Sequence, residues 1–340
     1  MDLRQLRYFV TVAEELHFGR AAARLAMTQP PLSQQIRALE EELGVTLFQR
    51  TQRSVALTPV GARWLVEVRR VLAEAAALPA LAQRLARGEV GSLSLAFVST
   101  ADYGILPAML RHFRDARPDV QVQLREATSD VQIEALLADE IDAGVVIAHH
   151  IGSVPGELEY RPLAREGLVL AAPAARAAQW GARPGRPIAL ADVAAEPLII
   201  FPRRSAPALY DIITGYHAAH GGAQEASTRI AQEAIQMQTI VSLVSAEMGV
   251  ALVPASLCNL QRTGVVYLEL AEPSPAIETG LVWRRDAVSP VLPWFVASAE
   301  AVARLHDNPN PETTPDSCSS IRNSIPSRCI SGRSPSAGTA

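Results

Sequence analysis

Residues 28–43 carry two helical patterns at once, and this constrains the chain more than any other feature of its sequence. Apolar side chains recur at the spacing of the buried side of an amphipathic helix. They are Leu32, Ile36, Leu39 and Leu43. The opposite side is polar and would place an amide, a hydroxyl and a guanidinium on one exposed ridge, groups that can hydrogen-bond to base edges. Its residues are Pro30, Ser33, Gln34 and Arg37.

Two shorter helical patterns precede this stretch and end in a tight turn at Met27 and Thr28. Thr28 suits the N-cap of the third helix, and Pro30 and Pro31 fall in its first turn, where no intrahelical donor is lost. Two short helices, a turn and a third helix predict a helix-turn-helix.

Two short strands joined by a polar turn, over residues 44–50 and 53–58, follow the third helix and predict a wing. Residues 1–60 should therefore form an all-α-type winged helix-turn-helix domain that binds double-stranded DNA. The residues expected to read bases or hold the DNA backbone are Arg20, Thr28, Gln29, Pro30, Ser33, Gln34, Arg37, Arg50 and Arg53. The alternative is a small helical domain whose polar face is merely solvated. The Ser, Gln and Arg content of that face, in place of a Glu and Lys mixture, favours DNA.

The same region resembles the amino-terminal signature of LysR-type transcriptional regulators. The resemblance implies a winged helix-turn-helix, a dimerising linker helix and a carboxy-terminal effector domain shaped like a periplasmic binding protein. The residues that carry it are Phe18 to Ala22, Arg24 and Leu25, Thr28 to Pro30, Leu32 and Ser33, Ile36, Leu39 and Glu40, Leu43 and Gly44, Leu47 and Phe48, and Arg50.

Charge is divided along the chain in the direction that DNA binding requires. The net charge is −4, but residues 1–60 hold seven Arg against six acidic residues and residues 61–90 hold five Arg against three, so the first 90 carry +3 and the rest −7. The chain contains no lysine, so Arg supplies every basic contact and no lysine-dependent catalysis is possible.

Length and composition describe a cytoplasmic globular protein of two or three domains. The chain has 340 residues, of which 49% are hydrophobic and 19% charged, without an apolar run long enough to span a membrane and without a signal peptide. The three cysteines have no metal-ligand spacing, and we expect no cofactor and no metal.

Residues 61–89 are expected to form a linker helix with a heptad seam. The seam consists of Gly61, Trp64, Val68, Val71, Ala75, Leu78, Ala82 and Leu85. A long helix packed on its own domain is the alternative, but a seam directly after a DNA-binding unit favours dimerisation. Pro79 predicts a kink or break, and Arg87 to Glu89 a hinge.

From residue 90 to residue 306, strand and helix patterns alternate, which predicts an effector domain of two α/β lobes. Lobe I should comprise about 90–162 and 267–306, and lobe II about 163–266. Residues 307–340 are rich in Pro, Ser, Thr and Asn and should be a disordered tail.

Ligands in open α/β sheets bind at the carboxyl ends of strands, and polar residues follow the expected strands here. Ser99 and Thr128 each lead toward a helix start, where an anion would be received; plain N-caps are the alternative. The family resemblance implies that Ser99, Thr100 and Thr128 hold an effector carboxylate, that Phe201 faces the apolar body of the effector and that Gln232 lies on the opposite lip. The expected effector-binding residues are Ser99, Thr100, Thr128, Phe201, Pro202, Arg203 and Gln232.

Within the family, the second lobe looks most like regulators that sense aromatic acids and their ring-cleavage products. Val146 to Ala148 depart from that branch, because relatives commonly place a basic residue there. Muconate-like diacids are therefore disfavoured, and a monocarboxylate or another small acid is open. Arg203 either supplies the missing charge or is simply solvated.

Enzyme and metal-site patterns are weak. The sequence holds no G-x-S-x-G and no G-x-G-x-x-G after a strand. His217 and His220 have a spacing that could ligate a metal, although exposed histidines near a helix end explain them better; His149 and His150 could place at most one side chain in the cleft.

Together these patterns predict a transcriptional regulator, not an enzyme, controlled by a small carboxylic acid. It should act as a homodimer or homotetramer, bind promoter DNA and contact RNA polymerase. The competing interpretation is a cytoplasmic solute-binding module with no regulatory role on DNA.

Overall fold

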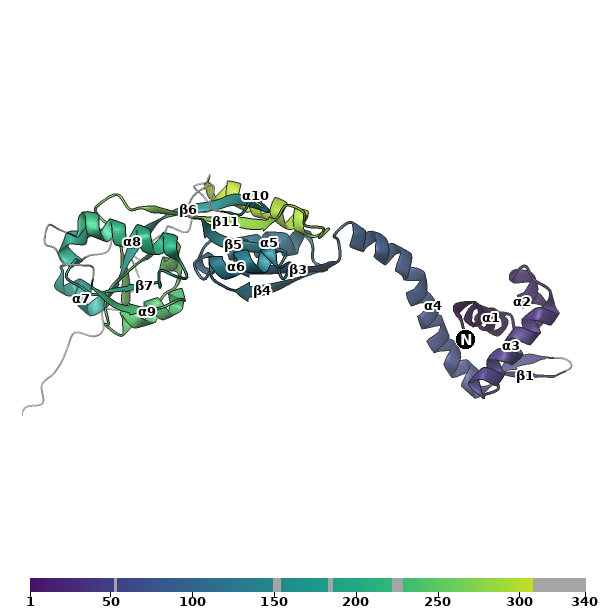
Figure 1. Cartoon of the computed structure of the whole chain (residues 1–340). Coiled ribbons are helices and arrows are strands. Elements are labelled where there is room, and N and C mark those ends of the chain that lie inside the picture. The colour runs from purple at the N-terminus through teal and green to yellow at the C-terminus, as the bar shows by residue number, and fades with distance from the viewer. Residues whose placement is uncertain (52–53, 149–153, 183–185, 222–228, 308–340) are drawn as a thin grey trace, which may run out of the picture. The chain divides into compact units, whose positions relative to one another are not determined.

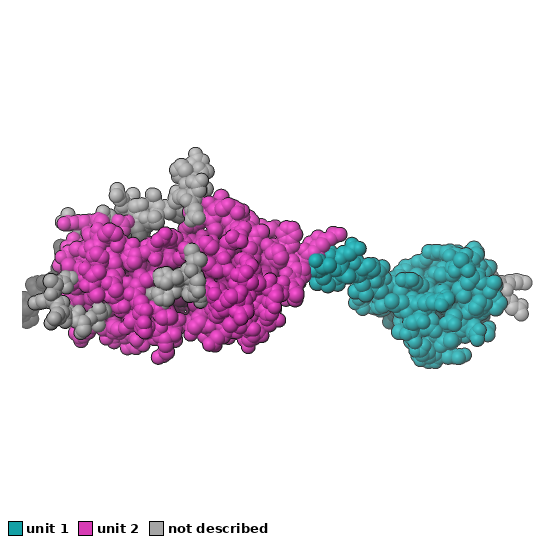
Figure 2. Space-filling model, turned by 45° about the horizontal axis from the view of Figure 1, so that its top comes forward, with its two compact units in different colours: residues 1–86 teal, residues 87–340 magenta. Residues whose placement is uncertain are grey.

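The computed structural model describes residues 1–51, 54–148, 154–182, 186–221 and 229–307. The chain divides into two compact units, Met1–Ala86 and Arg87–Ala340, which are coloured separately in Figure 2. The expected contact residue Arg53, the pair His149 and His150, and the expected tail from residue 308 onward lie outside the described residues.

The first unit is built from four helices and a two-stranded wing (Figure 1). Its elements are α1 (Leu3–Glu15), α2 (Phe18–Arg24), α3 (Gln29–Leu43), β1 (Phe48–Arg50), β2 (Val55–Leu57) and α4 (Pro59–Ala86). Local chemistry sets the boundaries. Asp2 and Gln5 form a capping box at α1, and Gly44, at φ 69°, ends α3 in the left-handed region. The helix-turn-helix and wing expected from the sequence are confirmed.

The apolar sides of the first three helices share one core with the wing and the start of α4. Phe9 lies at its centre, with ring centroids 5.4 Å from Phe48 and 4.6 Å from Trp64. Leu32, Ile36 and Leu39 of α3 are 0% exposed. The stripe expected to be buried in α3 therefore faces this core, and the polar side of the same helix is left outside.

Helix α4 runs from Pro59 to Ala86 without interruption, although Pro79 lies inside it. The break expected at Pro79 is not found. Proline removes one helical hydrogen bond, at a cost of about 3 kcal/mol, but the flanking Ala- and Leu-rich turns favour helix strongly. Along the expected seam, Val68 is buried in the core, while Leu78 and Leu85 are exposed.

The first lobe of the second unit is a mixed sheet covered by helices. Strands β3 and β4 run parallel, as do β3 and β5, whereas β11 is antiparallel to both β5 and β6. The elements are β3 (Gly91–Phe97), α5 (Leu106–Ala116), β4 (Val120–Glu126), α6 (Ser129–Leu137), β5 (Ala143–Ala148), β6 (Leu158–Pro173), β11 (Ala276–Arg284) and α10 (Leu292–Asp307).

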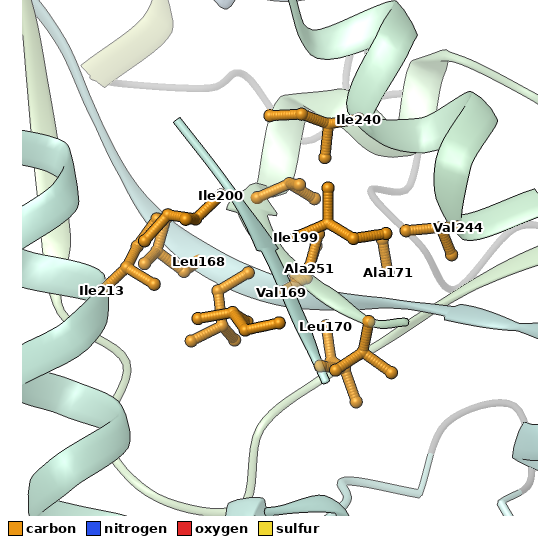
Figure 3. Packing of buried hydrophobic residues seen from close by; sticks show 14 of the residues in the cluster. Leu168, Val169, Leu170, Ala171, Ile199, Ile200, Ile213, Ile240, Val244 and Ala251 are labelled. Atoms are coloured by element: carbon orange, nitrogen blue, oxygen red, sulfur yellow. The ribbon is translucent and has the colours of Figure 1, made fainter. Parts of the chain in front are cut away.

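The second lobe surrounds the far half of β6. That half pairs with β9 and β10, and β7 runs parallel to β8. Figure 3 shows β6 side chains Leu168–Ala171 packed against Ile199 and Ile200 of β7 and against Ile240 and Val244 of α9. The elements are α7 (Ala174–Gln179), β7 (Leu198–Ile200), α8 (Pro207–His220), β8 (Ile230–Glu233), α9 (Met237–Ser245), β9 (Ala251–Pro254) and β10 (Val265–Leu268).

The chain passes between the lobes at two places that differ from the expected boundaries. The first crossing lies within β6, whose residues 158–167 pair with β11 and 168–171 with β9. The second follows β10, because β10 still pairs with residues 170–173 of β6 in lobe II. A crossing inside one continuous strand leaves no break in the hydrophobic pattern. The two α/β lobes themselves, and a fold like that of periplasmic binding proteins, are as expected.

The expected hinge at residues 87–89 coincides with the boundary between the units, yet its first residues are fixed to the second unit. The indole Nε1 of Trp294 donates a hydrogen bond of 2.9 Å to the Arg87 carbonyl. Gly88, at φ +64°, is buried, and a Cβ there would lie 2.2 Å from the carbonyl oxygen of Pro290. The Arg117 guanidinium stacks 3.9 Å from the Trp294 ring centroid.

Within the described residues, no helix combines the length and apolar character needed to cross a membrane.

Replacing Gly61 by alanine should destabilise the first unit. A Cβ at Gly61 would lie 2.2 Å from the Leu47 carbonyl oxygen, so α4 and the wing would have to separate. We expect a loss of about 1–3 kcal/mol in the free energy of unfolding, typical of overpacking, measured by thermal and denaturant unfolding. Gly215→Ala is the control, because a Cβ on that helical glycine meets nothing within 4 Å. Equal effects of the two substitutions would contradict the steric explanation.

Candidate functional site

The polar side of α3 is a continuous exposed surface. Gln29, Pro30, Gln34 and Arg37 are exposed, and Ser33 is half-buried. The guanidinium of Arg37 makes no hydrogen bond or ion pair with any described residue, so its five donors are available to an external acceptor. The structure thus brings together the residues that the sequence assigned to base contact.

The beginning of α3 is open to an anion. Thr28 occupies the N-cap with extended backbone angles, φ −86° and ψ 156°, but its side chain makes no capping hydrogen bond. The first-turn N–H groups of a helix have no intrahelical acceptor, and the helix dipole favours negative charge there. Pro30 and Pro31 carry no N–H, so Gln29 is the one residue among the first three of α3 with a backbone donor. This N–H and the hydroxyl of the exposed Thr28 can receive a phosphate oxygen.

The three arginines expected at the DNA backbone differ in their surroundings. Arg20 on α2 is largely exposed and lies 3.3 Å from Glu15. Arg50 is half-buried; it pairs with Glu40 and lies 5.0 Å from the centroid of the Phe18 ring. Arg53 lies outside the described residues. Arg50 is therefore held mainly by its own domain.

Glu40 lies behind this surface, on the inner side of α3, and its role there was not predicted from the sequence. Its Oε1 accepts hydrogen bonds from the backbone N–H groups of Leu47 and Phe48, at 2.8 and 3.0 Å, while Oε2 pairs with Arg50. One carboxylate thus attaches the wing to α3. The sequence does hold one indication of this role. Glu40 follows Ile36 by one helical turn and so lies on the inner side of α3, where a charged group needs partners.

A cavity of about 340 Å³ lies in the second unit, at the carboxyl ends of the lobe I strands. Of the expected effector-binding residues, it brings together Ser99, Thr100, Thr128 and Phe201. Its walls are mainly apolar and come from both lobes. They include Ile133, Val146, Ile147, Phe201, Leu209 and Ile235.

Two helices begin at this cavity without a side-chain cap. Thr128 precedes α6 and Gln236 precedes α9, and neither side chain makes a capping hydrogen bond. Ser99 does not cap a helix of its own lobe; its Oγ accepts a weak hydrogen bond of 3.4 Å from the Met237 N–H of α9. The interpretation of Ser99 and Thr128 as plain N-caps therefore does not describe their contacts.

Thr100 lines the cavity with a buried hydroxyl that could make a hydrogen bond to a ligand. The residue is 2% exposed, and its Oγ1 has no hydrogen-bond partner in the structure. A buried hydroxyl without a partner costs about 1–3 kcal/mol, which an incoming acceptor would offset. Gln236 and the start of α9 were missed from the sequence, because the contribution of α9 depends on how the second lobe folds over the first.

Pro202, Arg203 and Gln232 do not line the cavity. A turn after Phe201 directs Arg203 to the surface, where its guanidinium contacts Asp211 at 2.8 and 3.0 Å. The hydrogen bond to Asp211 raises the pKa of Arg203 above its ordinary value. Gln232 is exposed and donates to the Glu233 carbonyl at 3.2 Å. Of the two roles considered for Arg203, the structure shows the surface one.

The described residues hold no group of three or more His, Cys, Asp or Glu side chains that could bind a metal ion. His217 is buried, which lowers its pKa, and His220 packs on the Tyr216 ring with centroids 4.7 Å apart. His217 thus belongs to the core of lobe II, contrary to the expectation of an exposed side chain.

Comparison with known proteins accounts for both units. Residues 3–62 match the family model described as bacterial regulatory helix-turn-helix protein, lysR family, and residues 86–304 match the LysR substrate binding domain. The chain is a LysR-family protein. The HTH-type transcriptional regulator IlvR of Caulobacter vibrioides is 54% identical over 86% of this chain and 95% of its own length. TfdS of Cupriavidus pinatubonensis is 36% identical over 87% and 97%.

The crystal structure of full-length CbnR with its target DNA has a similar fold, with a TM-score of 0.67 and 31% identity over 89% of this chain and 100% of CbnR. This LysR-family chain is therefore a DNA-binding transcriptional regulator with an effector domain, and not an enzyme. The likeness to the branch that includes TfdS and CbnR is confirmed.

Glu40→Ala should loosen the wing of this regulator. Two backbone N–H groups and the Arg50 guanidinium would lose their acceptor, at a cost of about 1–3 kcal/mol. Amide hydrogen exchange in residues 46–51 and 54–58 of the full chain should accelerate, while exchange in lobe II stays unchanged. Glu41→Ala is the matched control, since its exposed side chain contacts none of these groups. Unchanged exchange in Glu40→Ala would show that the carboxylate does not hold the wing.

Proposed function

We propose that this LysR-family regulator reads promoter DNA with the polar side of α3 and responds to a small carboxylate bound in the lobe cleft. The observation that carries the proposal is the exposed guanidinium of Arg37, which pairs with no described residue and lies on the same side of α3 as the amides of Gln29 and Gln34 and the hydroxyl of Ser33. A helix of this kind enters the major groove in helix-turn-helix proteins. Gln29, Pro30, Ser33, Gln34 and Arg37 are the proposed base-reading residues.

The remaining contacts of the DNA-binding unit would be to phosphate. Thr28 supplies a hydroxyl and Gln29 a backbone N–H at the start of α3, and Arg20 adds a mostly exposed cation. Arg50 acts mainly by holding the wing through its ion pair with Glu40. Arg53, which lies outside the described residues, is proposed as a further phosphate contact. Such contacts fix orientation and carry no sequence information.

The assembly is proposed to be a homodimer through α4 and a homotetramer overall. Val71, Leu78 and Leu85 continue the heptad seam and are exposed in the single chain, at 40%, 59% and 44%. A second copy of α4 would cover them, because exposed apolar residues at heptad spacing pair in coiled coils. Two recognition helices would then meet two half-sites of one promoter, in the cytoplasm and next to RNA polymerase.

The effector is proposed to place a carboxylate at Thr100, between the N-termini of α6 and α9. Thr100 supplies a hydroxyl without a partner, and both helices supply first-turn donors. The effector can alter transcription only through different affinities for two arrangements of the assembly.

Arg37→Ala should weaken binding to the specific promoter site by about 1–3 kcal/mol, because a guanidinium at a base edge contributes on that scale. Fluorescence anisotropy would compare the chain's own upstream DNA with scrambled DNA at two salt concentrations. Arg262→Ala removes the same charge from an exposed position in the other unit and is the control. An equal loss on both DNAs would identify Arg37 as a phosphate contact instead.

Thr100→Val should leave the free protein equally or more stable and lower its affinity for carboxylates about tenfold. The isosteric change removes a buried hydroxyl that has no partner until a ligand arrives. Thermal unfolding would measure stability, and calorimetry with a panel of aliphatic and aromatic acids would measure binding. If the best acid of the panel binds both proteins equally, the carboxylate is not at Thr100.

A further inference from the structure

We infer that the ligand of the cleft is a small zwitterion, an apolar α-amino acid or a molecule of similar size that carries both a carboxylate and an ammonium group. The inference rests on the proposed function, in which the cleft binds a carboxylate at Thr100. It adds a second charged group of opposite sign and an apolar side chain.

The described residues that line the cavity include two carboxylates and no Arg, Lys or His. The carboxylates are Glu126, at the end of β4, and Asp130, in the first turn of α6. Both are exposed, and neither makes an ion pair or side-chain hydrogen bond with a described residue. Two carboxylates that pair with no described residue therefore share one cavity.

The same cavity also offers hydrogen-bond donors to an anion. Thr100 Oγ1 is buried without a partner, and it lies in a cavity to which α6 and α9 contribute uncapped N-termini. These donors are neutral, so they can offset one carboxylate through hydrogen bonds and helix dipoles. The cavity thus contains donors for one anion and two anionic groups that lack a counter-charge.

The presence of both anion donors and two carboxylates in one cavity distinguishes between ligand classes. A dicarboxylate would bring a second negative charge toward Glu126 and Asp130 with no described cation to balance it. A plain monocarboxylate would satisfy Thr100 but would leave both acidic side chains uncompensated. A ligand with an ammonium group next to its carboxylate satisfies both the donors at Thr100 and the carboxylates of Glu126 and Asp130, because opposite charges a few ångströms apart attract strongly where water is partly excluded.

The apolar wall of the cavity determines the size and polarity of the side chain that the ligand can carry. Val146 is 3% exposed and forms part of the apolar lining, together with Ile147, Phe201 and Leu209. A volume of about 340 Å³ lies at the small end of ligand sites, so it fits an aliphatic or single-ring side chain.

The experiment uses the full chain and pairs of ligands that differ only in the amino group. Calorimetry would compare L-valine, L-leucine and L-phenylalanine with 3-methylbutanoate, 4-methylpentanoate and 3-phenylpropanoate, and with cis,cis-muconate as a dicarboxylate. At least one amino acid should bind about tenfold or more tightly than its deaminated partner. Muconate should bind more weakly than either.

Charge-neutral variants identify the group responsible. Glu126→Gln and Asp130→Asn should reduce the preference for the amino acid, and the double variant should abolish it, while the affinity for the deaminated acid stays the same or rises. Glu134→Gln is the matched control: it lies on α6, is exposed and does not line the cavity. It should leave the preference unchanged.

The outcomes separate the inference from the proposed function. If deaminated acids or muconate bind more tightly than the amino acids, and Thr100→Val weakens that binding, the carboxylate site stands and the zwitterion inference is overturned. The same holds if an amino-acid preference survives in the double variant. If no acid of either class binds, or Thr100→Val leaves binding unchanged, the proposed carboxylate site fails, and the inference fails with it.

Discussion

The cleft depends on one strand that belongs to both lobes. β6 pairs with β11 over residues 158–167 and with β9 and β10 over residues 168–173, so neither lobe has a complete sheet without it. The side chains of its second half, Leu168 to Ala171, are almost fully buried in the core of lobe II. Moving the lobes apart therefore means bending a hydrogen-bonded strand, not opening a loose linker. The strand keeps the start of α9 opposite Ser99 and Thr100, and the cavity is the space that this arrangement leaves.

The polar groups at the two proposed binding sites differ from the polar group that holds the wing in how many hydrogen bonds they make within the described residues. Glu40 makes contacts with Leu47, Phe48 and Arg50, which fixes the wing. Arg37, three residues earlier on the outer side of the same helix, makes no hydrogen bond or ion pair with any residue that the structure describes. In the effector unit, the Thr100 hydroxyl has no partner among the described residues, and the N-cap side chains of α6 and α9 make no capping hydrogen bond. Burial without a partner costs free energy, and a ligand at Thr100 would offset it. Among the described residues, Gln132 Oε1 and Arg117 Nε are buried without a partner as well, and neither residue lines the cavity.

Much of the architecture could be predicted from the sequence, because helical and alternating patterns report which side of an element is buried. The recognition helix, the wing, the order of strands and helices in lobe I and four of the seven expected cleft residues were placed in this way. Predictions of lobe boundaries and of cavity residues were wrong or incomplete where the position of a residue depends on segments distant in the sequence. The strand pattern of β6 is continuous across the lobe boundary, so no local signal marks the crossing. Arg203 follows the correct strand but turns outward to Asp211, and Gln236 reaches the cavity only through the docking of lobe II.

Transmission of ligand binding toward the DNA requires that motion in the effector unit is not absorbed at the boundary between the units. A flexible hinge at residues 87–89 would absorb it. Instead, Arg87 is held by the Trp294 indole, and Gly88 is packed against the Pro290 carbonyl. At the other end of α4, Gly61 lies too close to Leu47 for even a methyl group. The helix is therefore fixed at its first turn to the wing, and the segment that follows it is fixed within the second unit. A ligand can change DNA binding only in proportion to its difference in affinity for two arrangements of the protein.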